Sequence, residues 1–228
     1  MRYKELTFEG RNAVIEAFRS GKTIDKLFIL DGCQDGPIKS IVREAKKTST
    51  IINYVDKERL DRLANTGHHQ GVVAIGAAYE YAEVEDILEA ARSKGEAPFI
   101  FVLDEIEDPH NLGAIIRTAN LAGAHGVIIP KRRAVGLTAT VAKTSAGAIN
   151  YTPVAKVTNI ANTIEALKKE GLWFVCADMG GETMYNLDLK GPIGLVIGNE
   201  GNGVSRLVKE KCDFVASIPT VSYTHLTL

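Results

Sequence analysis

The feature that most limits how this chain can fold is a short apolar run followed by a glycine-rich turn and a helical pattern. Ile193–Ile197 is almost wholly apolar, as expected of a parallel strand that is buried on both faces of a sheet. Gly198, Gly201 and Gly203 follow within six residues, before a helical pattern over residues 204–211. Because such a turn lets a ligand come close to free backbone N–H groups, we predict a ligand site here.

The order of the glycines argues against a dinucleotide as that ligand. The turn reads G-x-x-G-x-G, whereas dinucleotide folds use G-x-G-x-x-G, and Glu200 would repel a pyrophosphate. Glu200 is either a surface turn carboxylate or a ligand-binding or catalytic group. Asn199 and Asn202 are residue types that more often satisfy turn backbone than bind a ligand.

Strands and helices alternate along the chain, which predicts an α/β protein whose parallel sheet is covered by helices on both faces. The predicted strands are residues 26–30, 51–55, 71–78, 99–103, 127–129, 152–155, 172–177, 193–197 and 214–218. The predicted helices are residues 10–20, 37–45, 57–64, 84–91, 111–122, 138–146, 160–169 and 204–211.

An acidic stretch divides this series into two domains. Glu80–Glu96 is highly charged, has helical spacing of its apolar residues and contains Gly95 near its end. We therefore predict a first domain over residues 1–78, a linking helix over residues 79–97 and a second domain over residues 98–228.

Composition excludes several classes of protein. The formal net charge is −1, with 45% hydrophobic and 24% charged residues, so overall basicity does not indicate nucleic acid. Cys33, Cys176 and Cys212 lie far apart, which favours neither a disulfide framework nor a zinc site, and we expect no metal. We find no signal peptide and no apolar run of membrane-spanning length, so we expect a cytoplasmic protein that does not associate with a membrane.

A second candidate stretch follows the predicted strand Phe99–Leu103. Asn111 is placed to cap the next helix, and Gly113 and Arg117 share a face of it away from the buried stripe. One interpretation is that the glycine leaves room for a bulky group beside the guanidinium. The alternative is a solvated arginine on a helix that tolerates a glycine at a cost of about 1 kcal/mol.

Three further stretches are candidates for a functional role. Two of them allow two interpretations each, and the third belongs to the site at Gly198. Residues 68–71, His-His-Gln-Gly, either contact RNA or fill a turn, and we favour the turn. The basic residues 131–133, with Lys143, form either a phosphate patch or a solvated loop. Residues 177–182 follow a strand, so as a loop they would line the same cleft as Gly198.

Taken together, these motifs resemble a known family. They are Asn111-x-Gly113-x-x-x-Arg117, Ile197–Gly201, Ile218-Pro219, and the N-terminal stretches Phe8–Val14 and Gly67–Val72. In this order and spacing they resemble the SpoU/TrmH branch of the SPOUT RNA methyltransferases, over about residues 3–219. The similarity is greatest to the members that methylate a guanosine of 23S rRNA.

The resemblance implies a small N-terminal α/β substrate-binding domain and a parallel-sheet SPOUT methyltransferase domain with a C-terminal trefoil knot. It implies S-adenosylmethionine as the methyl donor, a ribose 2′-hydroxyl of rRNA or tRNA as the acceptor, and a homodimer. The catalytic positions of the family fall on Arg117, Asn111 and Glu200. Its cofactor-binding positions fall on Ala177, Asp178, Ile197, Gly198, Asn199, Gly201 and Ile218.

The resemblance stops at the end of the chain. After Ile218-Pro219 the family continues with a third motif rich in Ser and Asn and then a helix, whereas residues 220–228 here have neither pattern. We therefore expect the knot to be incomplete if this tail is native. An RNA-binding protein of the same fold without catalysis is the alternative function that this departure leaves open. A nucleotide-dependent oxidoreductase is disfavoured by the order of the glycines.

Overall fold

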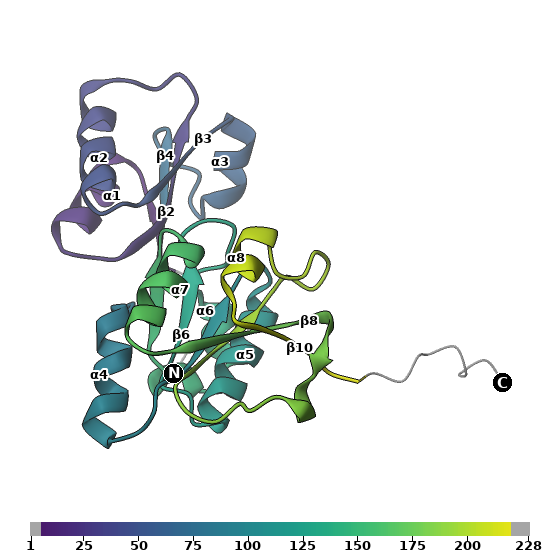
Figure 1. Cartoon of the computed structure of the whole chain (residues 1–228). Helices are drawn as coiled ribbons and strands as arrows, with labels where there is room; N and C mark the ends of the chain where they lie inside the picture. The colour runs from purple at the N-terminus through teal and green to yellow at the C-terminus, as the bar shows by residue number, and fades with distance from the viewer. Residues whose placement is uncertain (1–5, 220–228) are drawn as a thin grey trace. The chain divides into compact units, whose positions relative to one another are not determined.

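The computed structural model describes residues 6–219 and divides the chain into two compact units (Figure 1). The N-terminal unit is Met1–Glu80 together with Gly136–Lys143. The C-terminal unit is Tyr81–Val135 together with Thr144–Leu228. Residues 220–228 lie outside the described residues. The prediction of an incomplete knot, which depends on them, therefore lies outside as well.

The N-terminal unit is a four-stranded sheet between helices. The strand order is β1-β4-β2-β3, with β4 antiparallel to both β1 and β2 and with β2 parallel to β3. Its elements are β1 (Leu6–Glu9), α1 (Arg11–Arg19), β2 (Ile24–Leu30), α2 (Gly36–Lys47), β3 (Ile51–Val55), α3 (Lys57–Leu63) and β4 (Val72–Gly76). Helices α1 and α2 cover one face and α3 covers the other (Figure 1).

Local signals account for most of these boundaries. Asp56 caps α3, because its side chain accepts a hydrogen bond from the N–H of Arg59 at 2.7 Å, as predicted. Asp35 caps α2 in the same way through the N–H of Ile38 at 3.1 Å. Strand β1 was not predicted, since it has only four residues and lies at the edge of the sheet, where the apolar alternation is weak.

The C-terminal unit is a six-stranded, wholly parallel sheet, which confirms the predicted architecture. The strand order is β10-β8-β9-β5-β6-β7. Its strands are β5 (Phe99–Leu103), β6 (Gly126–Pro130), β7 (Val154–Val157), β8 (Trp173–Thr183), β9 (Ile193–Ile197) and β10 (Phe214–Ser217). Its helices are α4 (Val84–Lys94), α5 (Pro109–Leu121), α7 (Ile160–Lys169), α8 (Arg206–Lys211) and the 3-10 helices η1 (Ala148–Asn150) and η2 (Met184–Asn186). Helix α6 (Ala139–Thr144) spans the boundary between the units.

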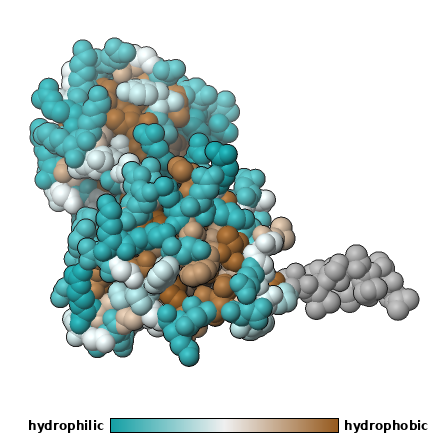
Figure 2. Space-filling view, in the orientation of Figure 1, coloured by the Kyte–Doolittle hydropathy of each residue, from teal (hydrophilic) through white to brown (hydrophobic). Residues whose placement is uncertain are grey.

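The largest core of the C-terminal unit lies between the sheet and the helices α4, α7 and α8. Ile164 and Val208 from the helices pack there against Phe174 and Val196 from the strands. Helix α5 lies on the other face of the sheet (Figure 1). Apolar patches remain visible on the surface of both units among the hydrophilic groups (Figure 2).

One predicted boundary is wrong in an informative way. We expected a strand to end at Ala177 and a loop to follow over residues 177–182, but β8 continues to Thr183. Cys176 pairs with Val215 and Glu182 pairs with the very next residue, Ala216. Residues 177–181 therefore have no partner in β10, although Ala177 still pairs with Ile197 of β9, and this bulge ends where Glu182 pairs with β10 again.

No helix within residues 6–219 is both long enough and apolar enough to cross a lipid bilayer.

Candidate functional site

The candidate site lies at one edge of the parallel sheet of the C-terminal unit. Strands β5, β9, β8 and β10 are neighbours and run in the same direction, so their carboxyl ends meet at that edge. This brings together residues that are far apart in the chain. Ala177 is the last position of β8 that pairs with β9, Ile197 ends β9 and is followed by the turn, and Ile218 directly follows β10. Ligands favour this edge in open α/β sheets.

The turn after β9 is organised by Asn199. Its backbone exchanges two hydrogen bonds with Gly203, at 3.0 and 2.8 Å. Its side-chain Oδ1 accepts from the N–H groups of Gly201 at 2.8 Å and Asn202 at 3.2 Å, and its Nδ2 donates to the carbonyl of Glu105 at 3.0 Å. The amide of Asn199 therefore shapes the turn and ties it to the loop after β5.

Glycine is required at the start of this turn. A Cβ on Gly198 would lie 2.2 Å from the carbonyl carbon of Gly203 and 2.3 Å from the N of Val204. Gly203 itself has φ +68°, in the left-handed region that favours glycine. The chain can double back on itself here only because two facing positions carry no side chain.

A buried carboxylate joins this turn to β5. Asp104 is 5% exposed and directly follows β5, and its Oδ2 accepts from the N–H of Ser205 at 2.8 Å. Ser205 is the residue before α8, so Asp104 fixes where that helix begins. The sequence interpretation missed this role, although an acidic residue at the end of an apolar strand was a visible signal.

Two of the predicted catalytic residues meet in the structure. The Nδ2 of Asn111 donates to Oε2 of Glu200 at 3.4 Å, across a separation of 89 residues in the chain. Both side chains are exposed. The pair therefore presents a carboxylate and an amide to solvent beside the turn after β9.

The prediction that Asn111 caps its helix is wrong. Helix α5 begins at Pro109, and its cap is Asp108, whose Oδ1 accepts from the N–H groups of His110 at 2.6 Å and Asn111 at 3.1 Å. An acidic residue followed by proline is a strong helix-start signal, and it takes precedence over an asparagine three residues later. The amide of Asn111 is thereby left available to Glu200.

Replacing Asp108 by alanine is expected to lower the free energy of unfolding of the C-terminal unit by about 1 kcal/mol, the usual value of a helix cap. Urea denaturation followed by the fluorescence of Trp173, the single tryptophan, measures this. The matched control is Asn111→Ala, which removes an exposed side chain and should change stability by less than about 0.5 kcal/mol. Equal losses in the two variants would contradict the assignment of the cap.

Arg117 lies two turns along α5 and is exposed. Among the residues that the structure describes, none forms a hydrogen bond or ion pair with its side chain. The guanidinium is thus free to bind an anionic group.

Gly113, which we predicted to leave room for a ligand beside Arg117, is closely packed. It is buried, and a Cβ there would lie 1.9 Å from Oγ1 of Thr144. The space beside Gly113 is filled by Thr144, so the idea that it admits a ligand is wrong.

The bulge in β8 carries Asp178, another of the predicted cofactor positions. A Cβ on Gly181 would lie 2.2 Å from the carbonyl oxygen of Val215, so the bulge rejoins the sheet at a position that only glycine fills. Asp178 forms an ion pair with Lys209 of α8, with 2.7 Å between Oδ2 and Nζ. That hydrogen bond lowers the pKa of Asp178 and raises the pKa of Lys209 relative to their ordinary values. Nothing in the local sequence predicted Lys209.

The residues at this edge suit S-adenosylmethionine, the cofactor that the sequence resemblance implies. An adenosine needs an apolar surface for its base and backbone groups that can bind its edges. Met179 in β8 is 88% exposed and Ile218, the residue after β10, is 67% exposed, while Ala177 and Ile197 are half-buried and pair with each other. Such apolar exposure at the ends of strands is the surface that a bound base would cover.

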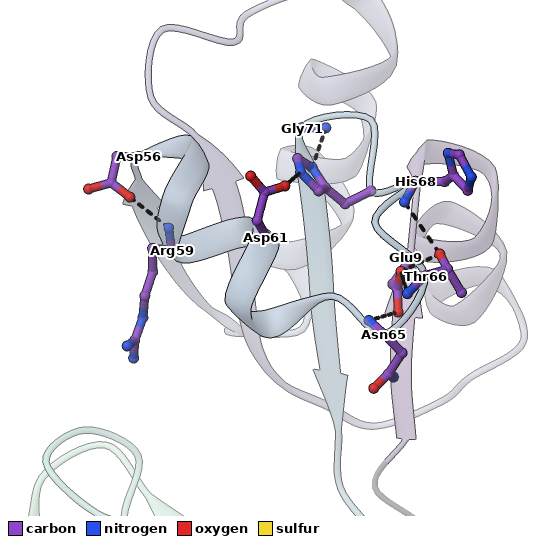
Figure 3. A network of polar contacts seen from close by, with 9 residues as sticks. Glu9, Asp56, Arg59, Asp61, Asn65, Thr66, His68 and Gly71 are labelled. Atoms are coloured by element: carbon purple, nitrogen blue, oxygen red, sulfur yellow. Dashed lines mark hydrogen bonds and ion pairs between the residues drawn. The ribbon is translucent and has the colours of Figure 1, made fainter.

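His69 of the N-terminal unit holds a turn, the interpretation favoured from the sequence for this stretch. His69 is 6% exposed; its Nδ1 accepts from the N–H of Gly71 at 3.0 Å, and its Nε2 lies 2.9 Å from Oδ1 of Asp61 (Figure 3). The carboxylate of Glu9 holds the same loop through Thr66, at 2.7 Å from its hydroxyl. His68 is exposed.

One of the basic residues 131–133 is engaged in an ion pair. Arg133 lies beside Glu105, with 2.9 Å between its Nη1 and the Oε1 of that carboxylate. A surface pair of this kind contributes little to stability.

Comparisons with known proteins agree with this two-part architecture. Residues 98–225 match the SpoU rRNA Methylase family, and residues 8–82 match the family described as RNA 2′-O ribose methyltransferase substrate binding. The "Putative TrmH family tRNA/rRNA methyltransferase YacO" of Bacillus subtilis is 53% identical over 92% of this chain and 84% of its own length. A relative of the same description from Staphylococcus saprophyticus is 47% identical over 97% of this chain and 89% of its own length.

Solved structures share the fold. The SpoU methyltransferase AviRb from Streptomyces viridochromogenes, in complex with the cofactor AdoMet, has a TM-score of 0.56 at 22% identity over 96% of this chain and 83% of that one. The AdoMet-bound rRNA methyltransferase from Sinorhizobium meliloti gives 0.56 at 22% identity over 96% and 80%. The expected combination of a substrate-binding α/β unit and a parallel-sheet methyltransferase unit is thereby confirmed. The chain belongs to the SpoU rRNA methylase family.

Proposed function

We propose that this protein transfers a methyl group from S-adenosylmethionine to a ribose 2′-hydroxyl of RNA, with a guanosine of 23S rRNA as the leading target. The observation that carries the proposal is the pairing of two matches in one chain. One half belongs to a methylase family, and the other matches a module described as binding the substrate of RNA 2′-O ribose methyltransferases. The relatives are named for both tRNA and rRNA, so tRNA is the second candidate substrate.

In this proposal the cofactor lies at the carboxyl edge of the sheet. The residues that hold it are Ala177, Asp178, Ile197, Gly198, Asn199, Gly201 and Ile218. Ile218 and Ile197 supply apolar surface, and the glycines keep backbone groups accessible, while Asn199 acts by shaping the turn. When bound, S-adenosylmethionine supplies a methyl group that is attached to a sulfonium. The sulfonium is already a good leaving group, so it needs little further activation.

The task left to the side chains is to position the hydroxyl and to manage developing charge. Arginine is a poor general base, because the guanidinium group stays protonated in proteins. We assign Arg117, whose guanidinium has no partner among the described residues, to binding an RNA phosphate and stabilising the charge that develops on the 2′-oxygen. Glu200, held by Asn111, completes the proposed catalytic set.

Two further features of the proposal follow from the same assignment. Because the proposed substrate is ribosomal RNA, we place the protein in the cytoplasm. We also propose a homodimer, the assembly that the family resemblance implies.

The direct test is methyl transfer. The protein is incubated with S-adenosylmethionine carrying a tritiated methyl group and with either a 23S rRNA transcript or bulk tRNA. The RNA is digested to nucleosides and analysed by mass spectrometry, and we expect 2′-O-methylguanosine from the rRNA. Label on tRNA alone would change the target but keep the reaction. Methylated bases, or RNA binding without any transfer, would overturn the proposed function.

A further inference from the structure

The N-terminal unit contains a pocket that none of the motifs or comparisons accounts for. It has a volume of about 400 Å³ and lies where β2 and β3 end, beside α2. Its lining combines apolar and polar side chains. The lining residues used below are Asp31, Gln34, Ile38, Lys39, Val42 and Tyr54. We name it the α2 pocket. The match to a substrate-binding family covers residues 8–82 as a whole and assigns no site within them.

An exposed aromatic ring forms one wall of the α2 pocket. Tyr54 lies on β3, which is the edge strand of its sheet, and is 56% exposed. Side chains two residues apart on a strand share a face, so Tyr54 points to the same side as Ile52, which packs in the core under α1 and α2. Ile38 and Val42, one helical turn apart on α2, face the same pocket. Ile38 is 1% exposed, so the accessible apolar surface of the pocket comes mainly from Val42 and from the ring of Tyr54 at its open edge.

The rim of the α2 pocket is polar. Asp31 and Gln34 are exposed, and among the described residues one carboxylate oxygen of Asp31 is engaged, by the N–H of Gly32 at 3.1 Å. A carboxylate accepts and an amide both donates and accepts, which are the functions that bind the edge of a nucleobase. The pocket therefore offers a base both a stacking surface and hydrogen-bonding partners.

A row of cations leads away from the α2 pocket. Lys39, Arg43 and Lys46 are spaced by four and three residues, so they share one exposed face of α2. We name this row the α2 basic ridge. Within residues 6–219, no hydrogen bond or ion pair engages the side chains of the ridge. Two acids close to the ridge along the chain are paired, Glu44 with Lys47 at 2.8 Å and Asp35 with Arg11 at 2.6 Å, whereas Asp31, which lines the α2 pocket with Lys39, has no ion-pair partner within residues 6–219.

We propose that the α2 pocket and the α2 basic ridge bind an unpaired segment of the substrate RNA. One unstacked base enters the pocket and stacks on Tyr54, and the flanking phosphates lie along Lys39, Arg43 and Lys46. Sequence-specific recognition of RNA uses unpaired bases in this way, because the deep groove of an RNA duplex does not admit side chains. This inference rests on the proposed function, since it supplies the site by which the enzyme holds its RNA.

The test measures binding of a fluorescein-labelled 15-nucleotide single-stranded RNA of mixed sequence, by fluorescence anisotropy, with the matching duplex as a second probe. Tyr54→Ala is expected to weaken single-strand binding about tenfold, the usual effect of removing one stacking ring. Tyr54→Phe keeps the ring and is expected to bind as the wild type does. Duplex binding is expected to be weaker and to be unaffected by either variant.

The contribution of the α2 basic ridge is tested by the salt dependence of RNA binding. The triple variant Lys39→Gln, Arg43→Gln, Lys46→Gln is expected to lower the slope of log K against log salt by about 2, since each single-strand phosphate contact contributes about 0.7. The matched control is the triple variant Lys57→Gln, Arg59→Gln, Arg62→Gln. It removes the same charge from exposed positions on α3 of the same unit and should leave the slope unchanged.

Unchanged affinity in Tyr54→Ala, equal salt slopes in the two triple variants, or no binding of the single strand by the wild type would each overturn this inference. The methyl-transfer assay on the wild type separates it from the proposed function. Transfer that persists with unchanged RNA affinity in Tyr54→Ala defeats the pocket alone. RNA binding that depends on Tyr54 without any transfer defeats the proposed reaction alone.

Discussion

Replacing Arg117 by alanine is expected to lower kcat for RNA methylation by about 100-fold to 1,000-fold, the loss typical of removing one group that stabilises transition-state charge. The fold should not change, because the guanidinium is exposed and has no partner among the described residues. Affinity for S-adenosylmethionine should also persist, since Arg117 is assigned to the RNA and not to the cofactor. Single-turnover transfer of a labelled methyl group and calorimetric titration with the cofactor measure the two effects separately.

Two control variants sharpen this prediction. Arg117→Lys keeps the charge but loses the planar fork that binds a phosphate through two hydrogen bonds, so we expect activity between that of wild type and Arg117→Ala. Arg92→Ala removes an exposed arginine of α4 that is paired with Glu170 at 3.1 Å, and it should leave kcat unchanged. Full activity of Arg117→Ala would remove Arg117 from the mechanism.

Replacing Gly198 by alanine is expected to lower the free energy of unfolding of the C-terminal unit by about 3 kcal/mol, the upper end of ordinary overpacking. The added Cβ would lie 2.2 to 2.3 Å from backbone atoms of Gly203 and Val204, and backbone cannot rotate away as a side chain can. The turn that Asn199 organises would have to open, so we also expect cofactor affinity to be lost. Urea denaturation followed by Trp173 fluorescence and calorimetric titration with S-adenosylmethionine test both effects.

Gly201 provides the matched control in the same turn. A Cβ there would meet only Oδ1 of Asn199, at the ordinary contact distance of 3.5 Å, so Gly201→Ala should change stability by less than about 0.5 kcal/mol. If Gly198→Ala were as stable as Gly201→Ala, the close packing of this turn would be refuted.

Elements with strong local signals were predicted to the residue. Ile51–Val55, Phe99–Leu103 and Ile193–Ile197 are strands at the expected bounds, and Ile160–Lys169 is a helix at the expected bounds. Each strand is a short run of mostly apolar residues, and the helix has an amphipathic face with an asparagine cap. Such patterns act over a few residues, so they can be seen without the rest of the fold.

Two of the errors arose where a second, distant segment decides the outcome. Whether residues 177–183 form a loop or a strand depends on β10, which pairs with β8 on both sides of the bulge. Whether Gly113 admits a ligand depends on Thr144, which fills that space. Local spacing carries no information on either partner, because both lie tens of residues away in the chain.

The same distinction applies to the candidate site. The residue types of the turn at Gly198–Gly203 and of the stretch around Arg117 were recognisable as motifs, because spacing along one strand or helix defines them. The contacts between these motifs could not be recognised from the sequence. They depend on the order of strands in the parallel sheet, which brings Asn111 to Glu200, Asp104 to Ser205 and Lys209 to Asp178. Local sequence determines which elements form, since caps and apolar periodicity act within a few residues. Side chains from separate elements become neighbours only when burial of the shared apolar faces aligns the strands, so the geometry of the site is a property of the folded sheet.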